Sequence, residues 1–420
     1  MTSGVFSASD PSHLRDSILY PRRRQLVLVD QCLESAIGHH LFYNRALADA
    51  ASDLGFETTI LAQRSFGGSL MSPHRCLTVF PRDSRAQPSP FAQRKPWILR
   101  WLDHVTMRQF RREIGKAFCG VEWKNDDLIF GQMMTPRHLA AWADWMAGQR
   151  GPGVPELFVH VSYDPSRFAA HRGFRSAWAK LTNSPNAKRL RPLTDSTRLL
   201  GAYEQLLGRK VRILPHVVDK TIRELSVPLP AAAPVLGVLG SPRCDKGFPV
   251  VAAAILATAD WNNRPRFIVQ TAGPDDGSRP WVERLREARL PHVEIVDRNI
   301  DSAQEYAALF ACTTVLLLPY RLKTYGVRTS GIFCEALASG RVVVISEQSW
   351  MHETAVQSDA AHLAVPEDDL DNLKRAIAEV ASSHEALLAK AALGVEKHSH
   401  EFSARRFVEK LTEFSSTDEV

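Results

Sequence analysis

Short aliphatic runs alternate with helical patterns along most of this chain, and this alternation limits its possible folds more than any other feature. The run RQLVLVD at 24–30 is followed by a loop, by a helical pattern that ends at Gly55, and by a second apolar run, FETTILAQ. Buried strands of parallel sheets have this aliphatic, β-branched character, and consecutive parallel strands are usually joined by a helix. The sequence therefore predicts an α/β fold with doubly wound parallel sheets.

The alternation comes in two series. The first ends with the run KVRILP, and the second starts with VLGVLGS, after the Pro- and Ala-rich segment SVPLPAAAP. A chain of 420 residues is also too long for a single core. The predicted units are an irregular tail at 1–23, an N-terminal domain at 24–217, a linker at 218–234, a C-terminal domain at 235–395, and a C-terminal helix at 396–420 that could pack back on the N-terminal domain. Two such domains would enclose a cleft, and open parallel sheets bind ligands beyond the carboxyl ends of their strands.

Charge and cysteine use narrow the functional classes. The net charge of +6 and the pI of about 9.0 favour anionic partners such as nucleotide phosphates. The six cysteines show no C-x-x-C pair and no histidine partner at metal-binding spacing, so we expect neither a disulfide framework nor a zinc site. No stretch reaches the roughly 18 apolar residues of a spanning helix, and the N-terminus lacks a signal-peptide pattern, so we expect a soluble cytoplasmic protein.

The first candidate site is the loop LGSPRCDKG, which follows the first strand of the second series. Gly240 ends the strand, Arg243 and Lys246 supply two cations, and Gly247 leads into a helix. Two cations and a helix N-terminus can converge on one phosphate group. The order of residues fits neither a Walker P-loop nor a dinucleotide-binding fingerprint. The competing interpretation is a solvated basic loop.

The second candidate site is RTSGIFCEALASG, between a predicted strand and a short helix. Gly331 would let backbone approach a ligand closely, and Thr329 and Ser330 add hydroxyl donors beside free helix N–H groups. A diphosphate would fit there, with Arg328 as a further cation. Glu335 follows one turn later and would repel phosphates, so it suits the hydroxyls of a ribose or a sugar. The competing interpretations are an ordinary N-cap and a surface glutamate.

Together with DSTRLLGAYEQLLGRKVRILPHVVD, these two segments resemble, in order and spacing, the retaining glycosyltransferases of family 4, which use nucleotide-activated sugars. The resemblance covers most of the chain and is most specific at EALASGRVVV. It implies the GT-B fold, in which two Rossmann-like domains face each other across a cleft. The nucleotide-sugar donor would then bind mainly to the second domain and the acceptor to the first.

The resemblance also implies roles for single residues of the donor site. Lys246 matches the lysine that neutralises the donor diphosphate, and we expect it to act in catalysis. Glu335 matches the acid that binds the nucleotide ribose. Ser241 stands where the family has a second phosphate-binding cation, an arginine, and Arg243 could replace it.

Val327 stands where the first glutamate of the family's E-x7-E motif contacts the transferred sugar. Three explanations remain open. Another polar residue of the loop contacts the sugar instead, such as Tyr325, Arg328 or Thr329; the donor lacks the usual hydroxyl pattern; or the protein is a non-catalytic relative. The preserved lysine and ribose-binding acid favour the first explanation.

In the first domain, the resemblance implies a cleft role for Gly38, His39 and His40, which would lie against the donor phosphates and the acceptor. Asp164 is expected near the reacting centre as a catalytic residue. His216, at the domain junction, is a further cleft candidate. A loop histidine is more often a surface or packing residue, and this is the competing interpretation for these positions.

Retaining members of the family are thought to transfer a glycosyl group through an oxocarbenium-like step, in which the leaving diphosphate accepts the acceptor's proton. The predicted function is transfer of a hexose from a nucleoside diphosphate sugar to a glycan or lipid-linked acceptor, in cell-surface polysaccharide assembly. No metal or other cofactor is expected, because no carboxylate cluster suggests one. A nucleotide-sugar epimerase and a non-catalytic sugar-nucleotide-binding protein are the competing hypotheses.

The most basic stretch of the chain, at 94–116, is predicted to be a helical insertion, near 94–118, in the first domain. Arg108 and Arg111 would share one helical face, with Trp101 beside it. Cations next to tryptophan suit a helix on anionic lipid, so peripheral contact with the inner face of the cytoplasmic membrane is one interpretation of this stretch. The competing interpretation is a packed helix with a solvated basic edge. No recognisable motif predicts nucleic-acid binding.

Overall fold

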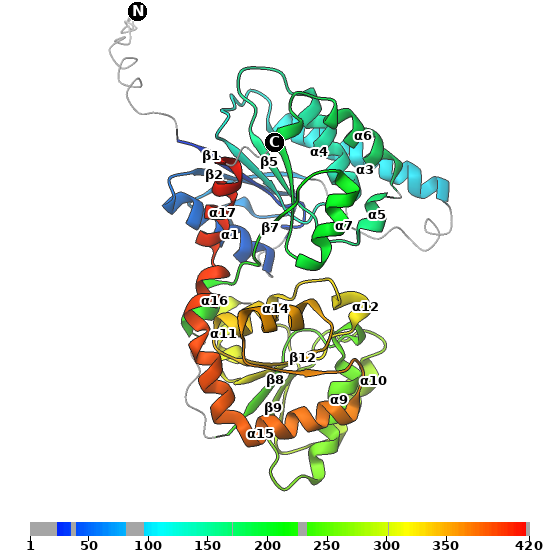
Figure 1. The fold of residues 1–420 in the computed structure, drawn as a ribbon, viewed down its shortest axis with the longest axis vertical. Helices are drawn as coiled ribbons and strands as arrows, with labels where there is room; N and C mark the ends of the chain where they lie inside the picture. The colour runs from blue at the N-terminus through cyan, green and yellow to red at the C-terminus, as the bar shows by residue number, and fades with distance from the viewer. Residues whose placement is uncertain are drawn as a thin grey trace, which may run out of the picture.

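The computed structural model describes residues 23–34, 39–80, 96–169, 171–225, 233–300 and 302–416 of the chain. Almost all of the predicted tail, the loop residue Gly38 and most of the Pro- and Ala-rich segment lie outside the described residues, as does the side chain of His39. The described residues form two α/β units stacked along the long axis of the molecule, each built on a parallel sheet (Figure 1). The predicted fold class of two α/β domains with parallel sheets is confirmed.

The first sheet has seven strands in the order β3-β2-β1-β4-β5-β6-β7, and every pair is parallel. The strands are β1 (Gln25–Val29), β2 (Glu57–Gln63), β3 (Arg75–Phe80), β4 (Leu128–Gly131), β5 (Glu156–His160), β6 (Leu190–Thr194) and β7 (Arg212–Ile213). Val27 and Val29 enter the core on one face, and Leu26 and Leu28 enter the core on the other, because successive strand residues point to opposite faces. Both faces are covered, so the central strands β1, β4 and β5 are buried along almost their whole length.

Helices cover the two faces of this sheet. One face carries α3 (Pro96–Ala117), α4 (Pro136–Gly148), α6 (Arg172–Thr182) and α7 (Thr197–Leu207), and the short α5 (Pro165–Ala169) lies beside them. The other face carries α1 (His39–Asp53). The core under α4 is aromatic, with Trp142 fully buried against Phe110 at a ring-centroid distance of 5.9 Å. This face therefore holds the helical insertion firmly through α3 and α4.

The second sheet has six strands in the order β10-β9-β8-β11-β12-β13, again all parallel. The strands are β8 (Val235–Val238), β9 (Arg266–Gln270), β10 (Val293–Val296), β11 (Val315–Leu318), β12 (Val342–Ser346) and β13 (His362–Val365). The helices around it are α9 (Phe248–Ala257), α10 (Arg279–Ala288), α11 (Ala303–Ala311), α12 (Leu322–Tyr325), α13 (Gly331–Ala338), α14 (Trp350–Ser358) and α15 (Leu370–Leu393). Each sheet reverses its strand order next to its first strand, which is where doubly wound sheets bind ligands.

The chain crosses between the two units twice. Within the predicted linker at 218–234, α8 (Lys220–Leu225) buries Ile222 against the second unit, next to the buried Val218. On the return, α16 (Val395–Glu401) leads into α17 (Ala404–Ser416), which lies along α1 of the first unit (Figure 1). Phe407 and Leu411 of α17 are buried in the core of the first sheet. The last helix therefore belongs structurally to the N-terminal domain.

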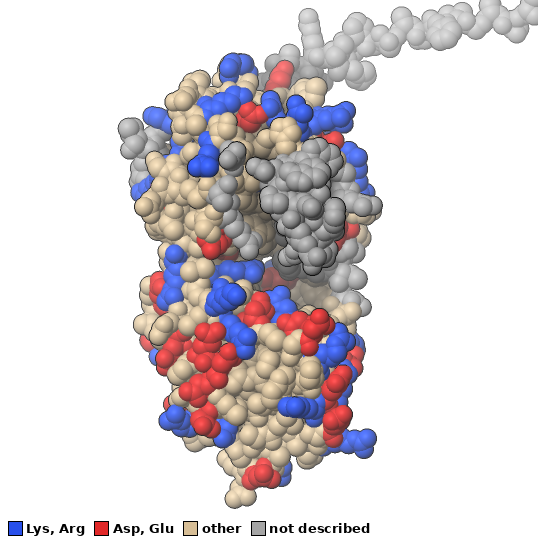
Figure 2. Space-filling view, turned by 90° about the vertical axis from the view of Figure 1, so that its right-hand side faces the viewer, with Lys and Arg blue, Asp and Glu red and all other residues tan. Residues whose placement is uncertain are grey.

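Charged side chains are spread over the surface. Figure 2 shows Lys and Arg scattered over the visible face of the first domain, and both signs intermixed on the second. On the basic helix α3, Arg111 pairs with Asp144, and Lys116 lies 3.6 Å from Glu113. Across the described ranges, no helix combines the length and apolarity needed to cross a bilayer. Contact of this helix with a membrane surface stays a prediction.

Candidate functional site

A cavity of about 790 Å³ lies between the two domains. Its walls come from the carboxyl ends of strands in both sheets, for example His160 at the end of β5 and Gln270 at the end of β9. The remaining walls come from α1, from the N-terminal halves of α11 and α13, from the crossover at 214–222, and from Phe407 of α17. The cavity therefore occupies the place where two facing doubly wound sheets would both present their ligand-binding edges.

Lys246 reaches the cavity from the loop after β8. Gly240 has φ +87°, and a methyl group at this residue would lie 2.7 Å from Nζ of Lys246, so the ammonium group lies against the turn. Gly247 has φ +68° and directly precedes α9, whose first turn includes Pro249. Burial, assisted by the nearby guanidinium of Arg243, lowers the pKa of Lys246 to about 8. A desolvated cation at the edge of a cavity is well suited to pair with an incoming phosphate.

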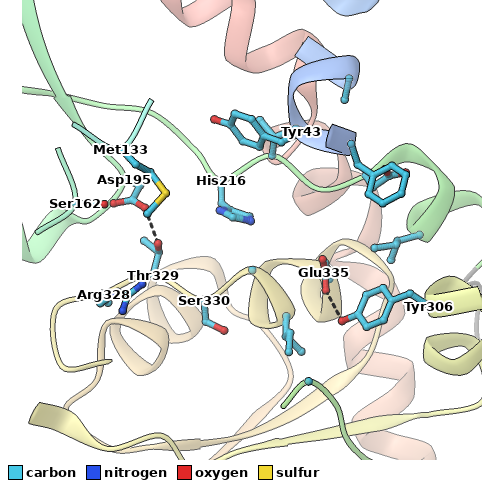
Figure 3. Close-up of a pocket in the computed structure, with 18 of the residues that line it drawn as sticks. Tyr43, Met133, Ser162, Asp195, His216, Tyr306, Arg328, Thr329, Ser330 and Glu335 are labelled. Atoms are coloured by element: carbon cyan, nitrogen blue, oxygen red, sulfur yellow. Dashed lines mark hydrogen bonds between the residues drawn. The ribbon is translucent and has the colours of Figure 1, made fainter. Parts of the chain in front are cut away.

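Glu335 faces the same cavity from α13. Its Oε2 accepts a hydrogen bond of 2.8 Å from the hydroxyl of Tyr306 on α11 (Figure 3). Burial raises the pKa of Glu335 to about 7, although the Tyr306 hydroxyl and Lys246 act in the opposite direction. Lys246 and Glu335 are thus brought together at one end of the cavity, as the two sequence motifs predict.

The N-terminus of α13 matches the N-cap interpretation of this segment, and a diphosphate site there stays a prediction. The hydroxyl of Ser330 accepts from the backbone N–H of Phe333 at 3.4 Å, so Ser330 is an N-cap. A methyl group at Gly331 would lie 3.0 Å from Nε2 of His216. The absence of a side chain at Gly331 therefore lets the imidazole of His216, from the other domain, pack against the helix N-terminus. Burial lowers the pKa of His216, which favours its neutral form. Ser330, Gly331 and His216 all line the cavity.

A polar centre spans the two domains at the other end of the cavity. Oδ2 of Asp195, which follows β6, accepts a hydrogen bond of 2.6 Å from the hydroxyl of Thr329 (Figure 3). Nε2 of His160 lies 3.5 Å from Oδ1 of the same carboxylate. Burial alone would raise the pKa of Asp195, but His160 and the Thr329 hydroxyl outweigh it and lower the pKa to about 2. Asp195 is therefore an ionised, largely buried carboxylate at neutral pH.

Residues at the start of α7 form hydrogen bonds and an ion pair with the second domain, next to this polar centre. Ser196 stands at the N-cap position, but its hydroxyl donates to the backbone carbonyl of Val327 in the second domain instead of capping α7. Arg198 forms an ion pair of 2.7 Å with Glu353 and donates to the carbonyl of Gly326 at 3.1 Å. The loop before α13 is thus held by residues of the first domain.

Three predicted site residues lie outside the lining of the cavity. Asp164 is exposed and accepts from the backbone N–H of Ser166, at the start of α5. Arg243 forms two hydrogen bonds with Asp245, of 2.9 and 3.0 Å, and its role as a replacement for the phosphate-binding arginine stays a prediction. Arg328, by contrast, does line the cavity.

His40 is the third of these residues. Its Nδ1 lies 2.7 Å from Oδ2 of the buried Asp30, which also accepts from Asn44 at 2.7 Å. The imidazole therefore helps to fix the start of α1 to the end of β1. This matches the packing interpretation of this residue.

Sequence reasoning missed His160, Asp195 and Tyr306. His160 ends a strand pattern and Asp195 follows another, which is the signal for a ligand-facing position in a parallel sheet. The local sequence around Asp195 indicates a helix cap instead, because an Asp-Ser pair before a helical pattern is typical of caps. Tyr306 carried no local signal, since its role depends on the distance to Glu335.

Comparisons with known proteins agree with this geometry. Residues 233–383 match the family model of glycosyl transferases group 1. No curated protein matches the chain in sequence. Among solved structures, sucrose-phosphate synthase from Thermosynechococcus elongatus is 15% identical, with 93% of this chain and 98% of that chain covered and a TM-score of 0.63.

Two further structures are similar along their whole length. HepE from Anabaena, in complex with UDP and glucose, is 16% identical, covers 94% of this chain and 100% of its own, and has a TM-score of 0.58. A glycosyltransferase from Rickettsia africae is 13% identical, covers 95% and 100%, and has a TM-score of 0.60. Likeness at this level of identity establishes the fold, so the predicted GT-B fold is confirmed.

Proposed function

We propose that this protein is a glycosyltransferase that moves a sugar, a hexose, from a nucleoside diphosphate to a glycan or lipid-linked acceptor, with retention of the anomeric configuration. The proposal rests on one observation: Lys246, Glu335 and the N-terminus of α13 line the same cavity between two doubly wound domains. The group 1 match of the second domain supports the reaction class, because the same residues lie within the matched range.

Each of these groups suits one part of a nucleoside diphosphate sugar. Lys246 and Arg328 supply positive charge for the diphosphate, and the α13 N-terminus adds unpaired backbone N–H groups. Glu335 and Tyr306 suit the ribose hydroxyls. In the proposed step the leaving diphosphate takes the proton of the acceptor, so the main task of the protein is to position the substrates and to stabilise charge. The proposal includes no metal.

The proposal also covers the donor class, the acceptor and the place in the cell where the protein acts. The Anabaena protein with this fold binds UDP and glucose, which supports a UDP-sugar as donor. We propose that the acceptor belongs to cell-surface polysaccharide assembly and that the protein acts in the cytoplasm, with α3 resting on the membrane surface. The basic residues of α3 support this last point.

A panel of donors tests the activity. UDP-glucose, UDP-galactose, UDP-N-acetylglucosamine and GDP-mannose are each incubated with the protein, and release of free UDP or GDP is followed over time. We expect release from one donor to exceed the others by about tenfold or more, because positioned contacts to a sugar discriminate at this level. A protein that neither binds nor cleaves any of the four would contradict the proposal.

Val327 supports a second candidate, a non-catalytic protein that binds sugar nucleotides. No carboxylate replaces the motif glutamate within the loop itself, and the Val327 side chain is 39% exposed and outside the cavity lining. The same panel separates the two candidates. Tight binding of one donor without release of its nucleoside diphosphate, with or without glycan acceptors, would establish the second.

The two shifted pKa values predict a narrow pH optimum for binding of UDP. Lys246 loses its charge above a pKa of about 8, and Glu335 becomes protonated below a pKa of about 7. We therefore expect the affinity for UDP, measured by isothermal titration calorimetry, to be highest between these two pH values. Outside this range the affinity should decrease, and the decrease should approach about tenfold per pH unit. The Glu335→Gln variant should lose the acidic limb and keep the alkaline limb. An unchanged profile in that variant would assign the acidic limb to another group.

A further inference from the structure

The cavity contains a carboxylate that the proposed function has not used. Three carboxylates line its described part, from Asp195, Asp219 and Glu335. Glu335 is engaged with Tyr306, and Asp219 accepts from the backbone N–H of Thr221 at the start of α8. Asp195 lies at the opposite end from Glu335, beside Thr329 and Ser162 (Figure 3).

The Asp195 side chain lines the cavity and is 14% exposed. Oδ2 is occupied by the Thr329 hydroxyl, but Oδ1 is buried and makes no hydrogen bond of good geometry within the described part of the chain. The same holds for Nε2 of His160, 3.5 Å away. Buried polar atoms without partners are costly, and the cost is greatest for a charged group. Here the two atoms face each other at 3.5 Å, and the Asp195 carboxylate borders the cavity, where hydroxyl groups of a ligand can donate hydrogen bonds to it.

The position of Asp195 relative to the phosphate-binding groups selects the part of the ligand. Its partner Thr329 lies two residues before Gly331, the first residue of α13. A diphosphate at that helix N-terminus would therefore bring its attached sugar next to Asp195. A carboxylate is repelled by phosphate but accepts strong hydrogen bonds from sugar hydroxyls.

The contacts of Val327 place the Asp195 carboxylate close to the loop position at which the motif glutamate is missing. The Val327 carbonyl accepts from Ser196, the residue next to Asp195. The loop of the second domain that lacks an acid is thus bonded to the segment of the first domain that carries one.

We infer that Asp195 binds the hydroxyl groups of the transferred sugar, and that the first domain supplies the sugar-binding carboxylate that the loop at Val327 lacks. The inference rests on the proposed function, since it requires a sugar nucleotide in the cavity. Because Asp195 and the phosphate-binding residues belong to different domains, the sugar is held fully only when the two domains are closed.

The test compares the affinity for a sugar nucleotide with the affinity for its free nucleotide. The four donors named above, with UDP and GDP, are titrated into the wild-type protein and into Asp195→Asn. We expect the variant to bind UDP or GDP as the wild type does and to lose about 10- to 100-fold of affinity for the preferred sugar nucleotide, which is the range for a hydrogen bond to a charged group. Asp126→Asn, an exposed carboxylate of the same domain, should change neither affinity.

Deoxy donors separate recognition from a structural effect. If UDP-glucose is the preferred donor, its 3-deoxy and 4-deoxy analogues are compared, and for one of them the wild type and Asp195→Asn should bind equally. Equal weakening of UDP and UDP-sugar in the variant would overturn the inference in favour of a structural role. A variant that keeps the full preference for the sugar nucleotide would overturn the inference alone, whereas a wild type that binds no nucleotide would overturn the proposed function as well.

Discussion

Replacing Lys246 by glutamine should lower kcat/KM for sugar transfer by about 100- to 1,000-fold, which is the usual effect of removing one preorganised charge-stabilising group. Lys246 is a half-buried cation at the wall of the cavity, and its ammonium group lies against the turn at Gly240. Negative charge on the leaving diphosphate increases as the sugar bond breaks, so the cation stabilises the transition state more than the bound donor. Glutamine keeps most of the length of the side chain and removes the charge.

The effect should appear mainly in kcat, with a smaller rise in KM for the donor, and it is measured by initial rates of nucleoside diphosphate release. Lys374→Gln serves as the control, because this lysine pairs with Asp371 on the surface of α15, away from the cavity. Activity within about threefold of the wild type in Lys246→Gln would show that the lysine does not perform the proposed electrostatic role.

Replacing Gly247 by alanine should destabilise the second domain by about 2–4 kcal/mol, because two costs add at this residue. The backbone is left-handed, with φ +68°, and an alanine Cβ would lie 2.1 Å from the carbonyl oxygen of Pro319. Pro319 follows β11, and Gly247 is the junction between the Lys246 loop and α9. The change therefore separates the two segments that carry the proposed donor-binding residues.

Thermal and urea denaturation, followed by circular dichroism, measure this loss of stability. Gly201→Ala is the matched control, since Gly201 lies inside α7 with no atom within 4 Å of the added methyl group and should gain about 0.5–1 kcal/mol. Binding of UDP to Gly247→Ala should also weaken at temperatures at which the variant remains folded. A variant that unfolds together with the wild type would mean that the loop moves aside at little cost.

Local spacing predicted one half of the candidate site well. Lys246 lies in the loop after β8, and Glu335 lies in α13, the helix that precedes β12, and parallel strands of one sheet present their carboxyl ends at one edge. Each residue could therefore be placed from its own segment, without knowledge of the rest of the chain. The Ser330 cap is of the same kind, because a helix N-terminus requires a local acceptor.

Residues after the strands of the first domain were harder to assign. Several polar residues follow β5, and the path of the backbone decides which of them faces the cavity. The structure places His160 and Ser162 in the wall and turns Asp164 away, toward α5. The role of Arg243 is hard to predict for a related reason, since the acidic Asp245 two residues along pairs with its guanidinium.

The sequence by itself determined the two α/β domains, the parallel sheets and the edge at which a phosphate and a ribose would bind, because each depends on periodicity and on residues within one or two turns. Only the tertiary structure decided that His216 meets Gly331 and that Asp195 meets Thr329 across the cleft. Those contacts join residues more than one hundred positions apart, and they form only because the docked domains set the distance between the two sheet edges. The missing acid at Val327 was visible in the sequence, whereas the carboxylate beside it was not.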